Sequence, residues 1–525
     1  MDTNKNVIKE KIKQLIDKCQ DEQVHLAIMV DYFTQGINKN SAPLESLQIL
    51  PFIKEKYMAE NFKKNIQKIV KSIKNEIKPG LLLYNVLSCV YGAFYGDALG
   101  AFCEFSKCSK DNHKKIFKTT PYFGGEKGQV TDDSEMAMSF AYAIMDSPSK
   151  ENLDPNYLYF YYGAWSKSHP IDIGHNTKKA LSKFNFNQFH PKRDGFKNVE
   201  IDIYQNNYKS LSNGFLMRKS TFIVWLYYRF YGEINKALDP KNKDSKLLLE
   251  LYKKIKDLSH IDNKCTHPNP ETDVASAFYC IMGLGILFKN VLRPNEVLDK
   301  LENLCKDELL KTGDELEKNF SNYFLHYLYK FKEKNFDFYK FFGDTNSQHC
   351  VSKKDMGYYF HAFLLTIYYL INYDKYESDS GYANIMNEIC DLGGDTDTNC
   401  CIVGGIIGPI FGMANFGPHF YKSLELIPQK RYIYSIALMV PYIMYLKKSN
   451  EDSSLIKNEH YFLQTILTLL YDDFEINLAW LIFNVNQLFY YLNIILIFIM
   501  SKNLLKLTIK INKNNFILII YNYNL

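Results

Sequence analysis

The sequence lacks a strong excess of charge of either sign. Its 525 residues include 63 lysines and arginines against 58 aspartates and glutamates, which leaves a formal charge of +5. Because so small an excess creates no strong field over the surface, the composition does not favour binding to nucleic acid or to another polyanion. We therefore expect no nucleic-acid partner.

Cysteine pairs of the kind that hold zinc are also missing. None of the eleven cysteines forms a Cys-x-x-Cys pair, and only Cys400 and Cys401 are adjacent. Scattered cysteines indicate neither a zinc knuckle nor a disulfide framework. We expect reduced thiols, most of them buried.

The N-terminus lacks an apolar stretch. It reads MDTNKNVIKEKIKQ, whereas a secretory signal needs about 7 to 15 consecutive apolar residues. This start predicts a cytoplasmic location. Residues 1–80 are rich in lysine, asparagine and isoleucine, and positions 66, 69, 70, 73 and 77 place Ile or Val on one helical face. A basic amphipathic helix can lie on a membrane, but docking on its own protein is the more common use, and we predict a helical extension.

Sustained period-two alternation is absent, so strands are not indicated. Hydrophobic residues make up 46% of the chain, and residues 81–448 carry apolar runs with helical spacing. This pattern predicts an all-α domain with a large buried core. Segments rich in Asn, Gly, Pro and charge predict loops near 107–130, 190–214 and 237–246.

Residues 449–525 form an apolar C-terminal tail. Within this tail, residues 476–501 contain no charged side chain, and a run of that length could span a bilayer. Five asparagines and glutamines in the run oppose a membrane helix, because each is costly in hydrocarbon without a partner. Membrane association through 476–501 is therefore kept as an alternative to a fully soluble tail.

Oxygen-bearing side chains are concentrated at the start of one predicted helix. Thr131, Asp132, Asp133 and Ser134 precede an apolar helical pattern. Hard oxygen donors of this type favour Mg²⁺ or Mn²⁺ over zinc when they converge on one point. The alternative is a capping box, in which Asp132 and Glu135 satisfy the first N–H groups of the helix.

A second cluster changes the balance between these alternatives. Asp395, Asp397 and Thr398 stand directly before an apolar stretch that contains Gly404, Gly405 and Gly408. Each glycine weakens a helix by about 1 kcal/mol relative to alanine, so we expect close approach of a neighbouring helix there. Carboxylates at a buried helix end repel one another unless cations neutralise them. Two such clusters indicate two metal ions, an arrangement that suits hydrolysis.

Several motifs, taken in order, resemble the ADP-ribosylglycohydrolase family. They are Gly92 to Glu104, Thr131 to Asp133, Ile171 to Leu181, Ser212 to Arg218, Thr266 to Pro268 and Asp395 to Thr398. They are spread over the 307 residues from Gly92 to Thr398. The resemblance implies an all-α, orthogonal multi-helix bundle with a central dinuclear metal cleft, which agrees with the helical pattern.

The resemblance also implies roles for individual residues. Those expected to hold two Mg²⁺ or Mn²⁺ ions are Thr131, Asp132, Asp133, Asp395, Asp397 and Thr398. Those expected to transfer protons are Glu104 and Asp172. Those expected to bind the substrate are Gly174, Asn176, Asn213, Gly214, Met217, Arg218 and His267.

The implied activity is hydrolysis of the glycosidic bond between ADP-ribose and an acceptor. The partners would be ADP-ribosylated proteins or small ADP-ribose conjugates, and a monomer is expected. One alternative is a catalytically silent, crystallin-like member that binds or packs. Another is a metal-dependent phosphohydrolase. The residues do not distinguish an arginine, serine or small-molecule linkage, nor Mg²⁺ from Mn²⁺.

Overall fold

The computed structural model describes most of the central part of the chain. The described residues are 82–105, 128–147, 152–167, 170–185, 195–287, 293–353, 355–378, 380–417 and 420, with a hairpin at 507–512 and 515–520. The predicted helical extension of residues 1–80 and the apolar segment 476–501 lie outside them. The chain forms two compact units, Tyr32–Tyr471 and a second one made of Met1–Asp31 and Asp472–Leu525.

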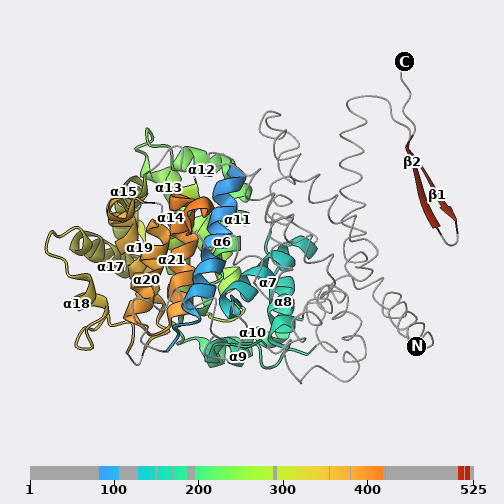
Figure 1. The fold of residues 1–525 in the computed structure, drawn as a ribbon, viewed down its shortest axis with the longest axis horizontal. Helices are drawn as coiled ribbons and strands as arrows, with labels where there is room; N and C mark the ends of the chain where they lie inside the picture. The colour runs from blue at the N-terminus through green and yellow to red at the C-terminus, as the bar shows by residue number, and fades with distance from the viewer. Residues whose placement is uncertain are drawn as a thin grey trace, which may run out of the picture. The chain divides into compact units, whose positions relative to one another are not determined.

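The larger unit is all-α, as the sequence predicts (Figure 1). Its first described helices are α6 (Leu82–Gly100), α7 (Asp132–Asp146), α8 (Pro155–Lys167), α9 (His175–Ala180), α10 (Lys197–Asn207), η3 (Asn213–Phe215), α11 (Lys219–Arg229), α12 (Tyr231–Ala237) and α13 (Ser245–Asn263). Next come α14 (Pro270–Leu287), α15 (Pro294–Asn303), η4 (Leu304–Leu309), α16 (Leu310–Thr312), α17 (Glu315–Phe331) and α18 (Phe338–Phe342). The last are α19 (Tyr359–Ile371), η5 (Tyr373–Tyr376), α20 (Gly381–Leu392), α21 (Thr396–Phe411) and η6 (Met413–Asn415). Among the described residues of this unit, pairing of the β type is limited to one bridge, between Ser212 and Tyr358.

The smaller unit contributes one element pair to the described part of the chain. Strands β1 (Leu507–Asn512) and β2 (Asn515–Ile520) pair antiparallel, with Leu507 opposite Ile520 and Asn512 opposite Asn515. The composition of the C-terminal tail does not predict this hairpin. Its strands nevertheless carry the isoleucines and leucines that favour extended structure.

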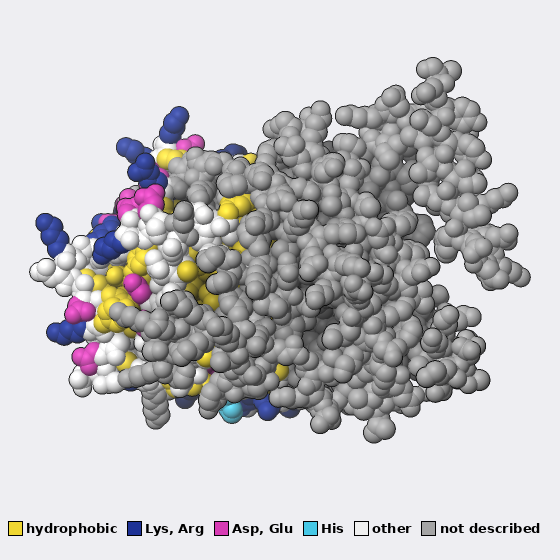
Figure 2. Space-filling view, viewed as in Figure 1, with side chains coloured by type: hydrophobic (Ala, Val, Ile, Leu, Met, Phe, Trp, Pro, Cys, Tyr) yellow, Lys and Arg dark blue, Asp and Glu magenta, His cyan; other side chains and the backbone are white. Residues whose placement is uncertain are grey.

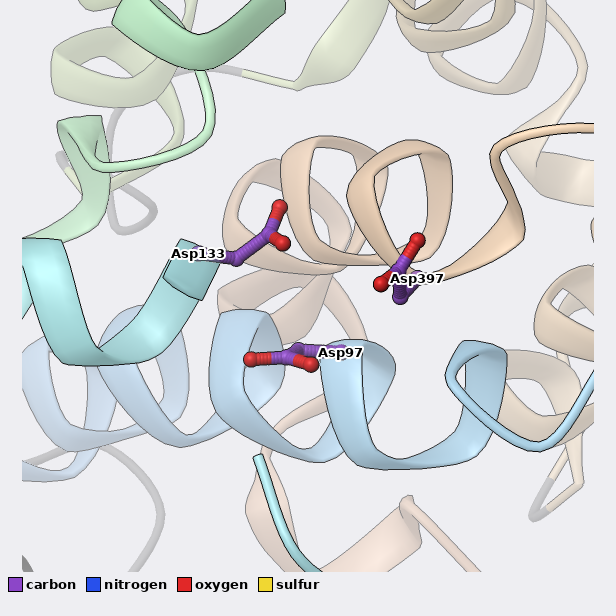
Figure 3. A group of neighbouring side chains, drawn as sticks. All are labelled: Asp97, Asp133 and Asp397. Carbon is purple, nitrogen blue, oxygen red and sulfur yellow. The ribbon is translucent and has the colours of Figure 1, made fainter. Parts of the chain in front are cut away.

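Helices α6 and α21 pack with their backbones in contact. A Cβ on Gly92 would lie 2.5 Å from Gly404 O, and a Cβ on Gly96 or Gly100 would collide with the backbone of Cys400 or Thr396. Along this contact the residue numbers increase in α6 while they decrease in α21, so the two helices are antiparallel. The end of α6 therefore meets the start of α21, as the close-up in Figure 3 also shows.

The expected reason for the glycines of α21 is confirmed at two of three positions. A Cβ on Gly404 or Gly408 would strike the backbone of α6, whereas a Cβ on Gly405 would be no closer than 3.4 Å to its nearest neighbour, Tyr279 Oη. Helix α21 is also central, because its residues from Thr396 to Pro409 are all buried. It packs against α6, α19 and α20, and the apolar helix α14 contacts it as well.

Two other expectations are wrong. Helix α10 lies inside the predicted loop 190–214. Its polar sequence buries only Ile203 and Asn207, so it has no apolar stripe from which a helix could be predicted. The cysteine prediction holds for the eight thiols that are free and buried. It fails at Cys103, which is disulfide-bonded.

The surface shows no segregation of charge on the visible described face. Lysine and arginine side chains there alternate with acidic side chains around the rim of the helices (Figure 2). Within the described part of the chain, no helix is long and apolar enough to cross a membrane.

Candidate active site

Asp97 of α6 caps helix α7 from outside. Helix α7 has Thr131 as its N-cap residue, and the Thr131 side chain makes no capping hydrogen bond. The carboxylate of Asp97 instead accepts hydrogen bonds from the backbone N–H groups of Thr131 at 3.1 Å and Ser134 at 3.2 Å. It also accepts from the two hydroxyl groups, at 2.9 and 2.5 Å. The predicted alternative of a capping box between Asp132 and Glu135 is therefore wrong, because a different helix satisfies the first turn.

Three helices bring carboxylates to one point (Figure 3). Asp97 of α6, Asp133 of α7 and Asp397 of α21 each place an oxygen within 4.8 Å of the others. Thr131 Oγ1 lies 2.9 Å from Asp133 Oδ2 and 3.4 Å from Asp397 Oδ2. Thr398 Oγ1 lies 3.5 Å from Asp133 Oδ2. Four of the six residues expected to bind metal thus face a common centre.

A second group adjoins the first. Glu104, Asp172 and Asp397 also place oxygens within 4.8 Å of one another. Asp397 belongs to both groups, so the two residues expected to transfer protons lie beside an expected metal ligand. This arrangement offers two neighbouring positions at which oxygen donors converge.

Asp132 and Asp395 face the surrounding loops. Asp132 Oδ2 accepts a hydrogen bond from Gly174 N at 3.1 Å, and Asp395 Oδ2 accepts one from Asn213 Nδ2 at 2.8 Å. Each of these carboxylates therefore connects a carboxylate cluster to a segment expected to bind substrate. Asp172 accepts a hydrogen bond from its neighbour Ile173 N at 2.8 Å.

Two glycines shape the turn that leads into α21. Gly393 and Gly394 have φ angles of 73° and 83°, a region that side chains rarely adopt. A Cβ on Gly394 would also collide with Val351 O. Gly394 O accepts a hydrogen bond from Phe105 N at 2.9 Å, which joins this turn to the segment that carries Glu104.

Burial makes the carboxylates reluctant to ionise. The pKa of Glu104 is raised to about 10, mainly by desolvation and secondly by repulsion from Asp395 and Asp172. Desolvation and neighbouring carboxylates also raise the pKa of Asp132, Asp133 and Asp397 well above the ordinary value. Desolvation raises the pKa of Asp97 to about 6, although its four hydrogen bonds oppose the shift. The charged state of this cluster needs a compensating positive charge.

The residues present fit divalent cations as that charge. Asp133 Oδ1 and Glu104 Oε2 are buried without a hydrogen-bond partner, and such orphaned oxygens are expensive in a protein interior. Among the described residues, no lysine or arginine forms an ion pair with any carboxylate of the cluster. Oxygen-only donors that include several carboxylates suit Mg²⁺ or Mn²⁺.

The expected substrate residues lie at the starts of short helices and in turns, and Gly174 and Asn213 connect them to the cluster. Asn176 Nδ2 donates to Ser212 Oγ at 3.1 Å, and Asn213 N donates to Gly357 O at 2.8 Å. A Cβ on Gly214 would lie 2.9 Å from His267 Cε1, so the histidine ring packs directly on this glycine.

Five of the seven expected substrate residues are buried, namely Asn213, Gly214, Met217, Arg218 and His267. Met217 is 4% exposed, and its carbonyl oxygen accepts from Cys401 Sγ at 3.5 Å. Arg218 is fully buried, and its Nε, Nη1 and Nη2 atoms all donate to protein oxygens. The guanidinium of Arg218 therefore has its donors already engaged within the fold.

Asp97 is the functional candidate that the sequence analysis missed. It is the one charged residue in the 19 residues of α6. An acid in an otherwise apolar, buried helix is costly unless its oxygens are satisfied. That signal could have identified Asp97 without a structure.

The larger unit of this chain is an all-helical domain with buried carboxylates where three helices meet, and such a site could hold metal ions. Comparison with known proteins is more specific. The model of the ADP-ribosylglycohydrolase family matches residues 80–448, and the chain belongs to this family.

Two relatives illustrate the similarity. A protein of Acanthamoeba polyphaga mimivirus, whose name assigns it to the ADP-ribosyl glycohydrolases, is 26% identical over 335 residues, which cover 62% of this chain and 86% of the viral protein. A solved structure described as an ADP-ribosylglycohydrolase-related protein complex aligns at 16% identity with a TM-score of 0.45, over 69% of this chain and 99% of that one.

Proposed function

We propose that this protein hydrolyses the glycosidic bond between ADP-ribose and an acceptor, and that the activity depends on two divalent cations. The observation that carries the proposal is the buried carboxylate cluster with unpartnered oxygens on Asp133 and Glu104. Family membership supports the ADP-ribosyl part of the proposal. Mg²⁺ or Mn²⁺ would be held by the six Thr and Asp residues of the two motifs.

Bound cations would polarise a water molecule and hold the oxygens of the ribose near it. The residues of the chain then do the rest. Asp97 keeps the Thr131–Asp133 turn in place through its four hydrogen bonds. Asn176, Gly174 and Asn213 frame the substrate side. Glu104 and Asp172 are the candidates for accepting the proton of the water molecule. Both lie beside Asp397, and neither belongs to the two motifs expected to bind metal.

The main alternative is a catalytically silent member that binds ADP-ribose conjugates without cutting them. A metal-dependent phosphohydrolase is the second alternative, since clustered aspartates also serve phosphoryl transfer. The three hypotheses differ in product. A glycohydrolase releases ADP-ribose, a phosphohydrolase releases phosphate or a nucleotide, and a silent member releases nothing.

The test uses the full chain with arginine- and serine-ADP-ribosylated peptides, in Mg²⁺, in Mn²⁺ or in EDTA. We expect ADP-ribose release that requires the cation and falls by at least about 100-fold in Asp397→Asn, a loss of the size seen when a charge-stabilising group is removed. Asp307→Asn, a change at an exposed acid of η4, is the matched control and should keep full activity. Equal release by Asp397→Asn would refute the proposal. Cation binding without release of any product would favour the silent member.

A further inference from the structure

A buried ionic cluster lies behind the substrate loops. Arg218 Nε and Lys219 Nζ contact Asp262 Oδ2 at 3.3 and 2.5 Å, and all three side chains are 0% exposed. Tyr162 Oη donates to Asp262 Oδ1 at 2.5 Å, and its ring lies 4.5 Å under the Arg218 guanidinium. Burial disfavours the charged form of Asp262, but the two cations hold its pKa at about 2. The cluster is thus a fixed arrangement of charges.

A chain of side chains leads from this cluster to the loops that frame the substrate. Arg218 Nη1 donates to Thr266 Oγ1 at 2.9 Å, and Thr266 Oγ1 lies 2.9 Å from His267 Nδ1. On the other side of the ring, His267 Nε2 lies 2.8 Å from Ser212 Oγ. Ser212 Oγ in turn accepts from Asn176 Nδ2 at 3.1 Å. Four hydrogen bonds therefore link a buried cation to Asn176.

The chemistry of Arg218 favours one direction for these hydrogen bonds. A guanidinium only donates, so Arg218 uses a lone pair of Thr266 Oγ1 and cannot receive the hydroxyl proton. Among the described residues, the other partner of Thr266 Oγ1 is His267 Nδ1. A buried hydroxyl proton is costly without an acceptor, and Nδ1 is the acceptor beside it. The favoured arrangement therefore directs the threonine proton to Nδ1 and leaves the hydrogen of a neutral His267 on Nε2.

His267 is neutral because it is fully buried near two cations. Desolvation, followed by repulsion from Arg218, lowers its pKa to about 3. A single ring proton on Nε2 then points at Ser212 Oγ, which also accepts from Asn176. With both lone pairs of Ser212 Oγ occupied, the hydroxyl proton of Ser212 is left to be donated, and its acceptor within the fold is Ser210 Oγ at 3.3 Å, which a ligand oxygen would replace.

We propose that Arg218 is a positioning residue that, through Thr266, sets His267 in the Nε2–H tautomer and so makes the Ser212 hydroxyl a hydrogen-bond donor to an oxygen atom of the bound ADP-ribose. The inference rests on the proposed function for its ligand. Ser212 is only half-buried, and it precedes Asn213, whose amide contacts the carboxylate cluster. Arg218 acts here without touching the substrate.

The backbone around this chain is held independently. Asn207 Nδ2 donates to both Asn176 O at 2.7 Å and Thr266 O at 2.9 Å. Removal of the Thr266 hydroxyl therefore leaves the two segments joined. This separation allows the side-chain chain to be tested without dismantling the fold.

The first measurement is the tautomer of His267 in the full chain, labelled with ¹⁵N-histidine, with the His267 signals assigned by their loss in His267→Gln. We expect the ¹⁵N shift pattern of an Nε2–H imidazole in the wild type. Thr266→Val should abolish that pattern by removing the proton donor to Nδ1, and Thr266→Ser should restore it. An Nδ1–H ring in the wild type, or an unchanged pattern in Thr266→Val, would overturn the inference.

The second measurement is ADP-ribose binding by titration calorimetry in the presence of Mn²⁺. Loss of one hydrogen bond predicts about tenfold weaker binding for Ser212→Ala and Thr266→Val. Ser182→Ala is the matched control, because it removes an exposed hydroxyl that donates to Lys179 O, away from Ser212. Wild-type affinity in Ser212→Ala would refute the substrate contact. If the wild type binds no ADP-ribose, the proposed function fails, whereas the tautomer measurement still decides the role of Arg218.

Discussion

Single side chains determine whether the carboxylate cluster can form. Asp97 satisfies the first turn of α7 with both of its oxygens, and those hydrogen bonds hold Thr131 and Asp133 toward Asp397. The capping carboxylate comes from α6. It therefore holds α7 against α6 as well as satisfying the N–H groups at the start of α7. A substitution at Asp97 should therefore also displace Thr131 and Asp133.

Asp97→Asn should weaken Mn²⁺ binding by about tenfold, because the amide nitrogen cannot accept the hydrogen bonds from Ser134. The measurement is Mn²⁺ titration followed by electron paramagnetic resonance. Ser139→Ala, which removes a hydroxyl that bonds back to Glu135 O within α7, is the control and should bind Mn²⁺ normally. Normal affinity in Asp97→Asn would show that the turn is held without this carboxylate.

His267 should make the stability of the fold depend on pH. Its pKa is lowered to about 3 by desolvation, so below the ordinary value of about 6.5 the unfolded chain binds a proton that the folded chain does not. Stability from this group is complete above pH 6.5 and falls as the pH drops toward 3; at pH 5 the loss is about 2 kcal/mol. Urea unfolding at pH 7 and pH 5 should show it, and His267→Gln should reduce the difference by that amount. An equal pH effect in both proteins would contradict the assignment.

The sequence predicted individual residues unevenly. Acids next to hydroxyls at a helix start were visible as motifs, because spacing along the chain brings them together. The partners of Asp97 are 34 to 37 residues away, and those of Arg218 are up to 48 residues away. Spacing carries no information on such contacts. Arg218 was expected to touch the substrate. It is instead buried and paired with Asp262, which belongs to none of the motifs.

At the scale of elements, the contact between α6 and α21 decides where the carboxylates meet. Five glycines, at positions 92, 96, 100, 404 and 408, allow the two backbones to touch. The glycines of α21 announced a close neighbour, but not which helix it was. Amphipathic or apolar helices such as α13 and α14 were predictable from their residues, whereas α10 was not, because it buries few side chains.

Gly96→Ala should destabilise the protein by about 1 to 3 kcal/mol or more, because its Cβ would collide with Cys400 and force the two helices apart. Gly405→Ala is the matched change on the facing helix. Its Cβ would meet Tyr279 Oη at 3.4 Å and Ala93 Cβ at 3.5 Å, which is ordinary contact. It should be neutral or stabilising by up to about 1 kcal/mol. Thermal unfolding of the two variants compares them directly, and equal midpoints would argue against backbone contact.

At the scale of the whole molecule, the unbalanced buried charge couples cation binding to folding. The carboxylates repel one another without cations, so ions that bind the folded chain alone stabilise it by about 2.7 kcal/mol at 100 times their dissociation constant. We expect Mn²⁺ or Mg²⁺ to raise the unfolding midpoint relative to EDTA. The shift should shrink in Asp397→Asn and remain in Asp307→Asn. A midpoint that ignores the cation would contradict a metal site in this cluster.

The all-α architecture of the larger unit was predictable because apolar residues recur there with helical spacing. The helix order and the meeting of three helix ends were not, since periodicity describes one element at a time. The N-terminal extension, the cytoplasmic location, the monomeric state and the membrane segment 476–501 stay predictions. The hairpin of β1 and β2 was not foreseen, because its two strands lie in a tail read only for its composition.

The antiparallel contact of α6 and α21 has a consequence for synthesis of the protein. Thr396 Oγ1 donates a hydrogen bond to Gly100 O across 296 residues of sequence. Two described helices that lie far apart along the chain must therefore meet before the carboxylate cluster exists. On a ribosome, α6 emerges long before its partner, and its glycine face stays uncovered until α21 has left the exit tunnel. Contacts of such long range form late and slowly. A nascent chain interrupted before Thr396 would therefore carry most of the described helices and no complete carboxylate cluster.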